Sequence, residues 1–472
     1  MDDSKTHYRT SAFKHVSTHF MQIKQWKDED LSQYSYAISS DCEKKMVLID
    51  PVRNPQQYLD YAKELDVKII AIIETHPHAD FISGHAELAS ITGADIYAGK
   101  LVNASYPHIP LFDGTTIEFG KIKLTALDTP GHSPDSISVL MEHNGHQHAV
   151  FTGDALFIGD CGRPDLREGS GQIKSTREEL ARAMYETLRT KFTPLADGTI
   201  LYPGHGAGTL CGKNLSTADS STMAAEKQTN WALQNLTEKE FMDTLLQDQP
   251  FVPAYFPFDV ELNRKGASGF RESIDAVKTV AGFMGRAQAA LLDRNLLIVD
   301  GREKRQFITG YLPDSVNLMN TSKFQTWLGS IIKPAEPFYL AAADEEQLKE
   351  LIQRAATIGY ESQIREAFLL NEGTETEAGL DLTIFKANVS NYTIVDVRNL
   401  SEAKNKSIFE HSILIPLHEL RDRMQSIPTN KPIVVHCAGG YRSAAGSSLI
   451  RSALGTGATV YDLGEEVKGF LL

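Results

Sequence analysis

At 472 residues, the chain is longer than one hydrophobic core usually supports, so we expect two or three domains. Its composition, with 42% hydrophobic and 23% charged residues, is typical of a globular protein and argues against a disordered, fibrous or membrane-embedded one. The formal net charge of -14 argues against nucleic acid as the main partner, because nucleic acid binding normally needs a basic face, although a locally basic pocket is compatible with it.

The N-terminal sequence "MDDSKTHYRTSAFKHVSTHF" is polar and contains no apolar stretch typical of a signal peptide. Apolar runs elsewhere are far shorter than the roughly 20 residues of a membrane helix. We therefore expect a cytoplasmic protein that does not bind membranes. The chain has four cysteines, which are widely spaced: Cys42, Cys161, Cys211 and Cys437. This spacing suits reduced thiols better than a disulfide framework.

In the first half of the chain, short β-strands alternate with helices. Apolar runs predict strands at 46–50, 67–74, 148–157 and 199–206, and helices at 55–65, 85–92 and 176–190, with a hairpin at 116–131. Each cluster of histidine or aspartate falls where a predicted strand ends. Open α/β layers usually place their chemistry at such strand ends.

Four of these segments supply candidate metal ligands. They are "THPHAD" with His76, His78 and Asp80, "DTPGHSPDS" with His132, "FTGDALF" with Asp154, and "YPGHGAG" with His205. Imidazole and carboxylate together suit zinc, iron or manganese. Separate loop histidines and helix-capping aspartates are the alternative, but four such segments in one half of the chain favour a shared metal centre.

The order HxHxD, PGH, GD, PGH resembles the metallo-β-lactamase fold, a four-layer αβ/βα sandwich, over roughly residues 8–260. Dinuclear members such as the glyoxalase II hydrolases continue HxHxD with another histidine, where this chain has Phe81. The resemblance to the persulfide dioxygenase branch implies one Fe(II) per chain, held by His76, His132 and Asp154. Such a triad leaves three positions open on iron, enough for a substrate sulfur and O2. His78, Asp80 and His205 would then orient the ligands or water, and direct binding of the metal by any of the three is the alternative.

Two cysteines lie near these segments. "GDCGRPDL" matches a loop of the same fold family in which the glycines and Arg163 shape the pocket, and we expect Cys161 there to be structural. Cys211 follows His205 by six residues in a glycine-rich turn. The resemblance implies a substrate-handling thiol at Cys211, beside the iron; a small buried apolar residue is the alternative.

The second half contains a weak internal repeat. The stretch 296–318 resembles 392–417, with Asp300 and Arg302 corresponding to Asp396 and Arg398. The two copies lie 96 residues apart in the chain, which is close to the length of one small α/β domain. We therefore predict three domains, at residues 1–265, 266–374 and 375–472.

The C-terminal stretch "KPIVVHCAGGYRSAAGSSLIRSAL" predicts a buried strand, a cysteine loop and a helix. Inward-pointing backbone N–H groups and the helix N-terminus should lower the pKa of the Cys437 thiol; a buried structural cysteine is the alternative. Cys437 to Arg442 is C-x4-R, which resembles rhodanese, whereas tyrosine phosphatases use C-x5-R. The resemblance implies that Cys437 carries a persulfide, held by the amides of 438–443 and by Arg442.

The first copy of the repeat has no such cysteine, because Ala342 occupies the position of Cys437. The middle domain thus resembles a rhodanese that cannot carry sulfur. We expect it to have a structural role, holding the two outer domains at a set spacing.

The expected fold class is α/β: a metallo-β-lactamase sandwich followed by two rhodanese-like domains with parallel sheets. The order of domains resembles fusions of persulfide dioxygenase and sulfurtransferase. This implies that a low-molecular-weight thiol persulfide is oxidised by O2 to sulfite, which combines with sulfane sulfur on Cys437 to give thiosulfate, as in sulfide detoxification.

Two alternatives stay open from the residues. One is a zinc thioester hydrolase like glyoxalase II with a rhodanese appendage, and the other is a sulfur carrier or persulfide sensor without catalysis. The sequence leaves the thiol carrier of the persulfide undetermined, and it is compatible with a homo-oligomer.

Overall fold

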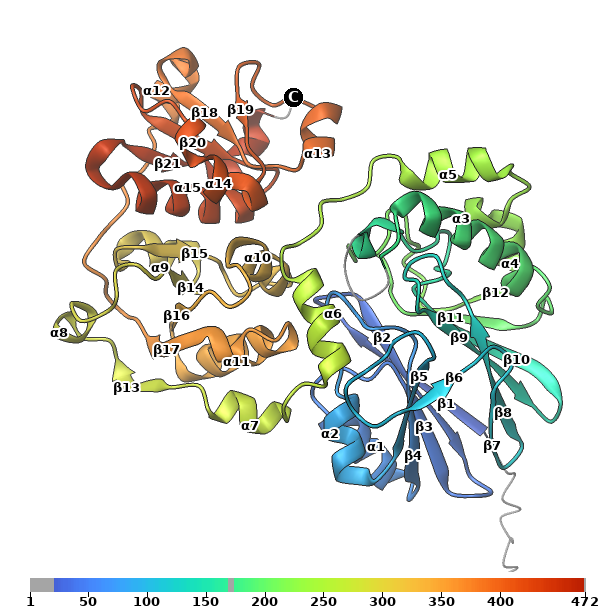
Figure 1. The fold of residues 1–472 in the computed structure, drawn as a ribbon. Coiled ribbons are helices and arrows are strands. Elements are labelled where there is room, and N and C mark those ends of the chain that lie inside the picture. Colours follow the sequence, from blue (N-terminus) through green and yellow to red (C-terminus); the bar gives the residue numbers. More distant parts are fainter. Residues whose placement is uncertain (1–20, 169–173, 471–472) are drawn as a thin grey trace, which may run out of the picture.

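The computed structural model of the chain describes residues 21–168 and 174–470 (Figure 1). The N-terminal half is built on two sheets of six strands. The first has the order β1 (Met21–Asp28), β2 (Gln33–Ser40), β3 (Lys45–Ile49), β4 (Lys68–Glu74), β5 (Asp95–Gly99) and β6 (Ile109–Leu111). The second has the order β12 (Ser221–Thr222), β11 (Ile200–Pro203), β10 (His146–Gly153), β9 (Ile137–His143), β8 (Ile122–Asp128) and β7 (Thr116–Phe119).

The two sheets pack face to face and helices cover both outer faces. Side chains such as Ile38 and Ile73 from the first sheet share one apolar core with Leu124 and Phe151 from the second. Helices α1 (Gln56–Glu64) and α2 (His85–Thr92) pack on the first sheet. The second sheet is covered by α3 (Arg177–Thr187), α4 (Met223–Thr229), α5 (Glu238–Leu246) and the short turns η2 (Leu188–Phe192) and η3 (Trp231–Leu233). A further turn, η1 (Asp165–Arg167), lies in the loop between β10 and α3. This is the predicted αβ/βα arrangement.

Local sequence explains where several of these helices begin. Thr176 accepts a hydrogen bond from the backbone N–H of Glu179, whose carboxylate accepts from the N–H of Thr176, and Thr237 and Glu240 repeat this capping box. These two capping boxes fix the N-terminal ends of α3 and α5.

The middle unit, residues 256–370, contains a five-stranded parallel sheet. Its strands, in spatial order, are β13 (Thr279–Phe283), β17 (Ile364–Leu369), β16 (Phe338–Ala342), β14 (Ile298–Asp300) and β15 (Ser315–Asn317). Its helices are α6 (Phe256–Lys265), α7 (Phe270–Asp275), α8 (Arg286–Ala289), α9 (Lys304–Thr309), α10 (Phe324–Ile331), α11 (Glu345–Thr357) and the turn η4 (Glu361–Gln363).

The C-terminal unit, residues 382–470, has a four-stranded parallel sheet. Its strands, in spatial order, are β19 (Ile413–Leu414), β18 (Thr393–Asp396), β20 (Ile433–His436) and β21 (Val460–Asp462). Its helices and turns are α12 (Leu382–Ala387), η5 (Val389–Asn391), α13 (Leu400–Asn405), η6 (Leu417–Glu419), α14 (Leu420–Arg423), η7 (Met424–Ser426), α15 (Tyr441–Leu454), η8 (Gly455–Gly457) and η9 (Gly464–Phe470). The predicted α/β class, with a sandwich followed by parallel sheets, is confirmed.

The repeat seen in the sequence has the same local structure twice. Arg302 binds the Asp300 carboxylate at 2.7 Å, and Arg398 binds Asp396 at 2.6 Å, each pair buried after the first strand of its copy. Ala342 ends β16, whereas Cys437 directly follows β20. The domain boundaries at 265 and 374 stay predictions.

The middle unit contacts both of its neighbours. Arg53 of the N-terminal sandwich makes two hydrogen bonds of 2.6 and 2.9 Å with Glu361. On the other side, the backbone N–H of Asn317 donates to Ser448, and the Tyr441 hydroxyl donates to the carbonyl of Met319. In the parts of the chain that the structure describes, no helix is both long and apolar enough to cross a membrane.

Candidate metal centre and thiol pocket

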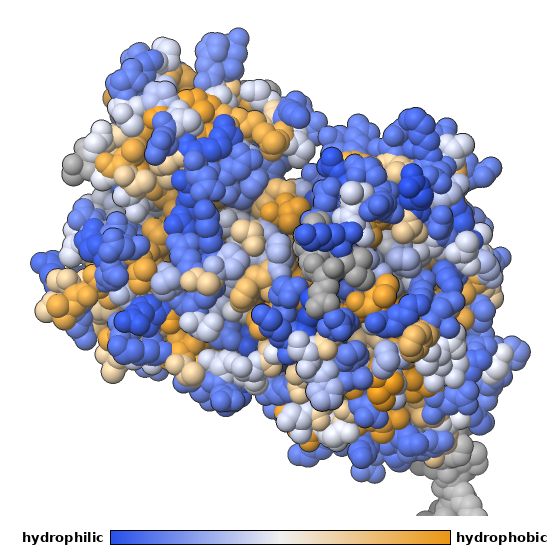
Figure 2. Space-filling view, viewed as in Figure 1, coloured by the Kyte–Doolittle hydropathy of each residue, from blue (hydrophilic) through white to orange (hydrophobic). Residues whose placement is uncertain are grey.

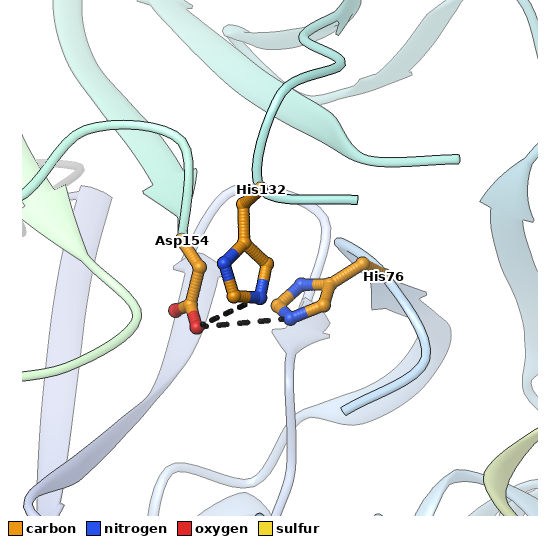
Figure 3. A group of neighbouring side chains, drawn as sticks. All are labelled: His76, His132 and Asp154. Carbon is orange, nitrogen blue, oxygen red and sulfur yellow. Dashed lines mark ion pairs between the residues drawn. The ribbon is translucent and has the colours of Figure 1, made fainter. Parts of the chain in front are cut away.

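Two histidines and an aspartate converge from three loops between the sheets (Figure 3). His76 follows β4, His132 follows β8 and Asp154 follows β10, so each side chain stands just beyond the end of a strand. The Asp154 Oδ2 atom lies 3.8 Å from His76 Nε2 and 3.5 Å from His132 Nε2. All three side chains are at most 2% exposed.

Hydrogen bonds on the far side of each ring fix its orientation. The Thr75 hydroxyl donates to Asp50 at 2.7 Å and therefore accepts from the Nδ1–H of His76 at 3.0 Å. The Nδ1–H of His132 donates to the backbone carbonyl of Arg163 at 3.0 Å. With Nδ1 protonated in both rings, the Nε2 lone pairs face Asp154, which is the arrangement that metal-binding histidines adopt.

Electrostatics prepare the same three groups for a cation. Burial lowers the pKa of His76 well below its usual value and also lowers that of His132, so both rings are neutral at pH 7. Burial alone would raise the pKa of Asp154, but the charge and hydrogen bond of His205 outweigh it and lower this pKa. Two neutral imidazoles and one carboxylate are the protonation states that metal binding requires.

Asp154 Oδ2 has no hydrogen-bond partner among the described residues, although it is fully buried. A buried carboxylate oxygen without a partner is costly, and a cation between it and the two Nε2 atoms would remove that cost. The ligand atoms of His76, His132 and Asp154 lie within 4.8 Å of one another. These residues fit a metal ion, and their assignment as its ligands stays a prediction.

Three other candidate residues form a second group beside this triad. The Nδ1 atom of His205 lies 2.8 Å from Asp154 Oδ1, and its Nε2 atom lies 2.7 Å from Asp80 Oδ2, both within hydrogen-bond distance. Burial opposes a charge on this ring, but the two carboxylates raise its pKa well above the usual value, so it is protonated and donates to both. His205 therefore holds Asp154 in place, as predicted for a residue that orients a ligand. Cys211 Sγ lies within 4.8 Å of the ligand atoms of Asp80 and His205.

Phe81, which stands where dinuclear enzymes have a histidine, packs against His78. Their ring centroids are 4.3 Å apart, and Phe81 is 2% exposed. His78 itself faces Asp50 at 3.2 Å and Glu74 at 3.6 Å. An apolar ring thus occupies a space in which another ligand was conceivable.

The loop that carries Arg163 joins the metal centre to the turn of Cys211. The backbone N–H of Arg163 donates to the carbonyl of Cys211 at 3.1 Å, and its guanidinium donates to the carbonyls of Leu210 at 3.1 Å and Pro250 at 2.5 Å. Gly162 is needed here because a Cβ on it would overlap the carbonyl oxygen of Asp154. Cys161 is buried among the apolar residues under α3, which suits the structural role expected for it.

The second candidate site is the loop after β20. The N–H of Gly440 donates to Cys437 Sγ at 3.1 Å, and Gly440 has a φ of +100°, a left-handed conformation that favours glycine. Helix α15 begins at the next residue, Tyr441. A strand, a glycine turn and a helix start therefore surround the sulfur, as predicted.

Arg442, which lines the same cavity as Cys437, is paired with a carboxylate. Its two terminal nitrogens donate to the Glu402 carboxylate at 2.6 and 2.7 Å, and its guanidinium carbon lies 5.9 Å from the centre of the Trp327 ring. The sequence analysis assigned no role to Glu402, which lies four residues after Arg398 in the second copy of the repeat. Trp327 carried no such signal, because it belongs to the middle unit.

Cys437 lines a cavity of about 350 Å³. Its walls come from five parts of the chain: Gly208, Leu210, Phe251, Lys323, Thr326, Trp327, Asn399, Cys437, Gly439, Tyr441 and Arg442. Leu210 is the residue before Cys211, so the turn beside the metal centre also borders the thiol pocket.

Comparison with known proteins agrees with both sites. A model of the metallo-beta-lactamase superfamily matches residues 29–205, and a model of the rhodanese-like domain matches residues 381–467. The mitochondrial persulfide dioxygenase ETHE1 of Bos taurus is 32% identical over 186 residues, which cover 39% of this chain and 67% of that protein. The chain belongs to the metallo-beta-lactamase superfamily.

Other members of this superfamily are similar to the chain. The human ETHE1 persulfide dioxygenase is 31% identical, over 36% of this chain and 63% of that protein, and the probable hydroxyacylglutathione hydrolase glo2 of Schizosaccharomyces pombe is 31% identical, over 40% and 70%. A crystal structure described as a metallo-beta-lactamase from Staphylococcus aureus matches with a TM-score of 0.65 at 30% identity, over 74% of this chain and 99% of that one.

These matches confirm the predicted fusion of a metallo-beta-lactamase domain, similar to persulfide dioxygenases, with a C-terminal rhodanese domain. They also confirm that the chain is an enzyme, whose family binds a metal.

Proposed function

We propose that the chain is a non-heme Fe(II) persulfide dioxygenase coupled to a sulfurtransferase. A low-molecular-weight thiol persulfide, O2 and water would give the thiol, sulfite and two protons at the first site. Sulfite would then take a sulfane sulfur from Cys437 and leave as thiosulfate. The observation that carries this proposal is the buried His76, His132 and Asp154 triad, with its unpartnered carboxylate oxygen, in one chain with a rhodanese-type thiol loop.

His76, His132 and Asp154 would hold one iron per chain. When bound, the iron would supply the redox chemistry that lets a sulfur and O2 react, which no protein side chain provides alone. Thr75 and the carbonyl of Arg163 keep the two rings turned inward, and the protonated His205 keeps Asp154 ionised. Burial of the triad excludes bulk water from the reacting sulfur.

Cys211 would receive the persulfide beside this centre. Burial, followed by the charges of Asp80 and Asp154, raises the pKa of its thiol well above the usual value. The side chain is therefore a neutral thiol next to two carboxylates. It can donate a hydrogen bond to a persulfide anion without repelling it.

Cys437 would carry the transferable sulfur. In the transfer, the sulfite sulfur attacks the outer sulfur of the Cys437 persulfide, the S–S bond of the persulfide breaks, and the Cys437 thiolate is released. No oxidant or reductant is consumed in this step. The N–H of Gly440 already points at Sγ and would stabilise the thiolate as it forms.

Cys437→Ser should separate the two activities. The variant should consume O2 with persulfide at a rate within about twofold of the wild type, because its metal centre is intact, but it should release sulfite and form less than a tenth of the thiosulfate. Cys42→Ser, at an exposed cysteine, is the matched control and should behave as the wild type. Unchanged thiosulfate output in Cys437→Ser would contradict the two-site scheme.

Asp154→Ala should remove metal and O2 consumption together, because two neutral imidazoles alone bind a divalent ion weakly. Metal content by mass spectrometry and O2 uptake by electrode measure the two effects in the same sample. Asp113→Ala, at an aspartate whose side chain is 46% exposed, should leave both unchanged. The ligand assignment is wrong if Asp154→Ala retains iron and activity.

A further inference from the structure

The cavity at Cys437 is not built by the C-terminal unit alone. That unit supplies Asn399, Cys437, Gly439, Tyr441 and Arg442 to its lining, and the remainder comes from elsewhere. Lys323, Thr326 and Trp327 belong to the α10 region of the middle unit. Figure 1 shows α10 next to the C-terminal unit, and in Figure 2 the surface is hollowed between that unit and the N-terminal sandwich, with hydrophobic residues at the base.

The charge of this cavity also comes from the middle unit. Lys323 and Arg442 are the charged residues among its lining, and both are basic. The charge of Arg442 is compensated, because both of its terminal nitrogens bind Glu402. For Lys323, no carboxylate of the described residues lies within ion-pair distance. In a chain of net charge -14, Lys323 therefore leaves this cavity with an uncompensated positive charge.

Packing holds α10 beside the cavity, and the exposed side chain of Lys323 lines the cavity at the start of this helix. Lys323 immediately precedes α10, and Trp327 lies one turn further on the same face. The Trp327 ring stacks on Phe251 at 5.4 Å, and Phe251 stacks on His418 of the C-terminal unit at 4.2 Å. At the other end of α10, Arg421 of the C-terminal unit donates to the carbonyl of Ile331 at 2.8 Å. The middle of α10, through Phe251, and its C-terminal end are thus tied to the unit that carries Cys437.

We propose that the middle unit supplies the anion-binding wall of the thiol pocket, with Lys323, placed by Trp327, binding the sulfur oxyanion that accepts sulfur from Cys437. The inference rests on the proposed function and names its acceptor class, a sulfite-type oxyanion. It would give the middle unit a role beyond the structural one expected from the sequence. Lys323 would draw sulfite toward the outer sulfur of the Cys437 persulfide, and the leaving thiolate stays on Cys437.

A single-turnover experiment on the full chain tests this role. Cys437 is loaded with sulfane sulfur from excess thiosulfate, the excess is removed by desalting, and the sulfur is discharged either by sulfite or by cyanide at pH 7, where cyanide is mainly the neutral acid. Thiosulfate and thiocyanate are measured against acceptor concentration. In Lys323→Gln, the sulfite concentration for half-maximal discharge should rise about 5- to 10-fold, as expected for the loss of one charge contact, with the maximal rate within about twofold.

The controls separate a loss of sulfite binding from other effects of the substitution. Lys323→Arg should restore sulfite binding to within about twofold, and discharge by cyanide should be unchanged in both variants. Lys349→Gln, at an exposed lysine of α11 outside the cavity, should match the wild type. An unchanged sulfite dependence in Lys323→Gln, or an equal change in Lys349→Gln, would overturn the inference while loading of Cys437 still supported the proposed function. A wild-type Cys437 that accepts no sulfane sulfur would overturn both.

Discussion

Burial sets the protonation state of single residues, and His436 is an example outside the metal centre. It ends β20, directly before Cys437, and neither of its ring nitrogens has a hydrogen-bond partner among the described residues. Burial lowers its pKa to about 4, and Asp396, 3.9 Å away, offsets this only in part. The ring is therefore a neutral support for the thiol loop, packed against Phe409.

The pKa of His436 predicts a loss of stability in acid. An unfolded histidine binds a proton near pH 6.5, whereas the folded ring binds one only near pH 4, so the unfolded state gains protons first as the pH falls. Between pH 7.5 and pH 5 this lowers the free energy of unfolding by roughly 2 kcal/mol. Thermal unfolding of wild type and His436→Phe at both pH values measures it. A parallel fall in both proteins would contradict the prediction.

Residues of the candidate site differ in how far the sequence could predict them. The gathering of His76, His132 and Asp154 was predictable because each follows an apolar strand, and strand ends meet in such a fold. Their selection as a triad from the larger set of candidates came from the resemblance to persulfide dioxygenases. The pairing of Arg442 with Glu402 was not, because it depends on how α13 packs beside the thiol loop. The spacing of Cys437 and Arg442 indicated the rhodanese loop, but it did not indicate which carboxylate pairs with the arginine.

At the scale of elements, the loop before and within η1 holds the metal centre and the Cys211 turn in register. Arg163 is 1% exposed, pairs with Asp165 at 2.6 Å, and donates to the carbonyls of Leu210 and Pro250. Glycines and an arginine in "GDCGRPDL" indicated a shaped loop, but its partners lie 47 and 87 residues away along the chain. Such long-range carbonyl contacts leave no pattern in the sequence.

Arg163→Met should loosen this loop. Removing the guanidinium leaves two carbonyls and Asp165 without their donor, at a cost of roughly 3–5 kcal/mol in unfolding free energy. Cys211, 1% exposed in the wild type, should then react at least about tenfold faster with a thiol reagent, measured by mass spectrometry of the labelled peptide. Arg177→Met, at an arginine 52% exposed, is the control. Equal labelling of Cys211 in both variants would show that Arg163 does not hold the turn.

At the scale of the whole molecule, the fold class and the order of the units were predictable, whereas their packing was not. The repeat of Asp300 and Arg302 at Asp396 and Arg398 marks two related units, but nothing in the sequence pairs Arg53 with Glu361, 308 residues away. For the same reason, the sequence did not predict that the middle unit lines the thiol pocket. Trp327 and Lys323 line this pocket only because the middle and C-terminal units pack together.

The Arg53–Glu361 pair should hold the N-terminal sandwich on the middle unit. Both side chains are buried, 3% and 7% exposed, so Arg53→Met leaves an unpaired buried carboxylate and should destabilise the interface by roughly 3–5 kcal/mol. The double variant Arg53→Met/Glu361→Leu should recover most of this loss. Calorimetry of the full chain measures both, with the exposed Arg182–Glu238 pair as control, where Arg182→Met should cost less than about 1 kcal/mol. Equal destabilisation in the single and double variants would contradict the role of the pair.

The proposed function requires that the buried triad of His76, His132 and Asp154 holds one iron at which a persulfide is oxidised. The most direct test is to purify the chain without oxygen, measure its metals by mass spectrometry, and record O2 uptake in the same sample on adding glutathione persulfide. A mononuclear iron centre predicts about one iron per chain and O2 consumption that depends on the persulfide. Two zinc ions per chain without O2 uptake would contradict it and favour a thioester hydrolase of the glyoxalase II kind.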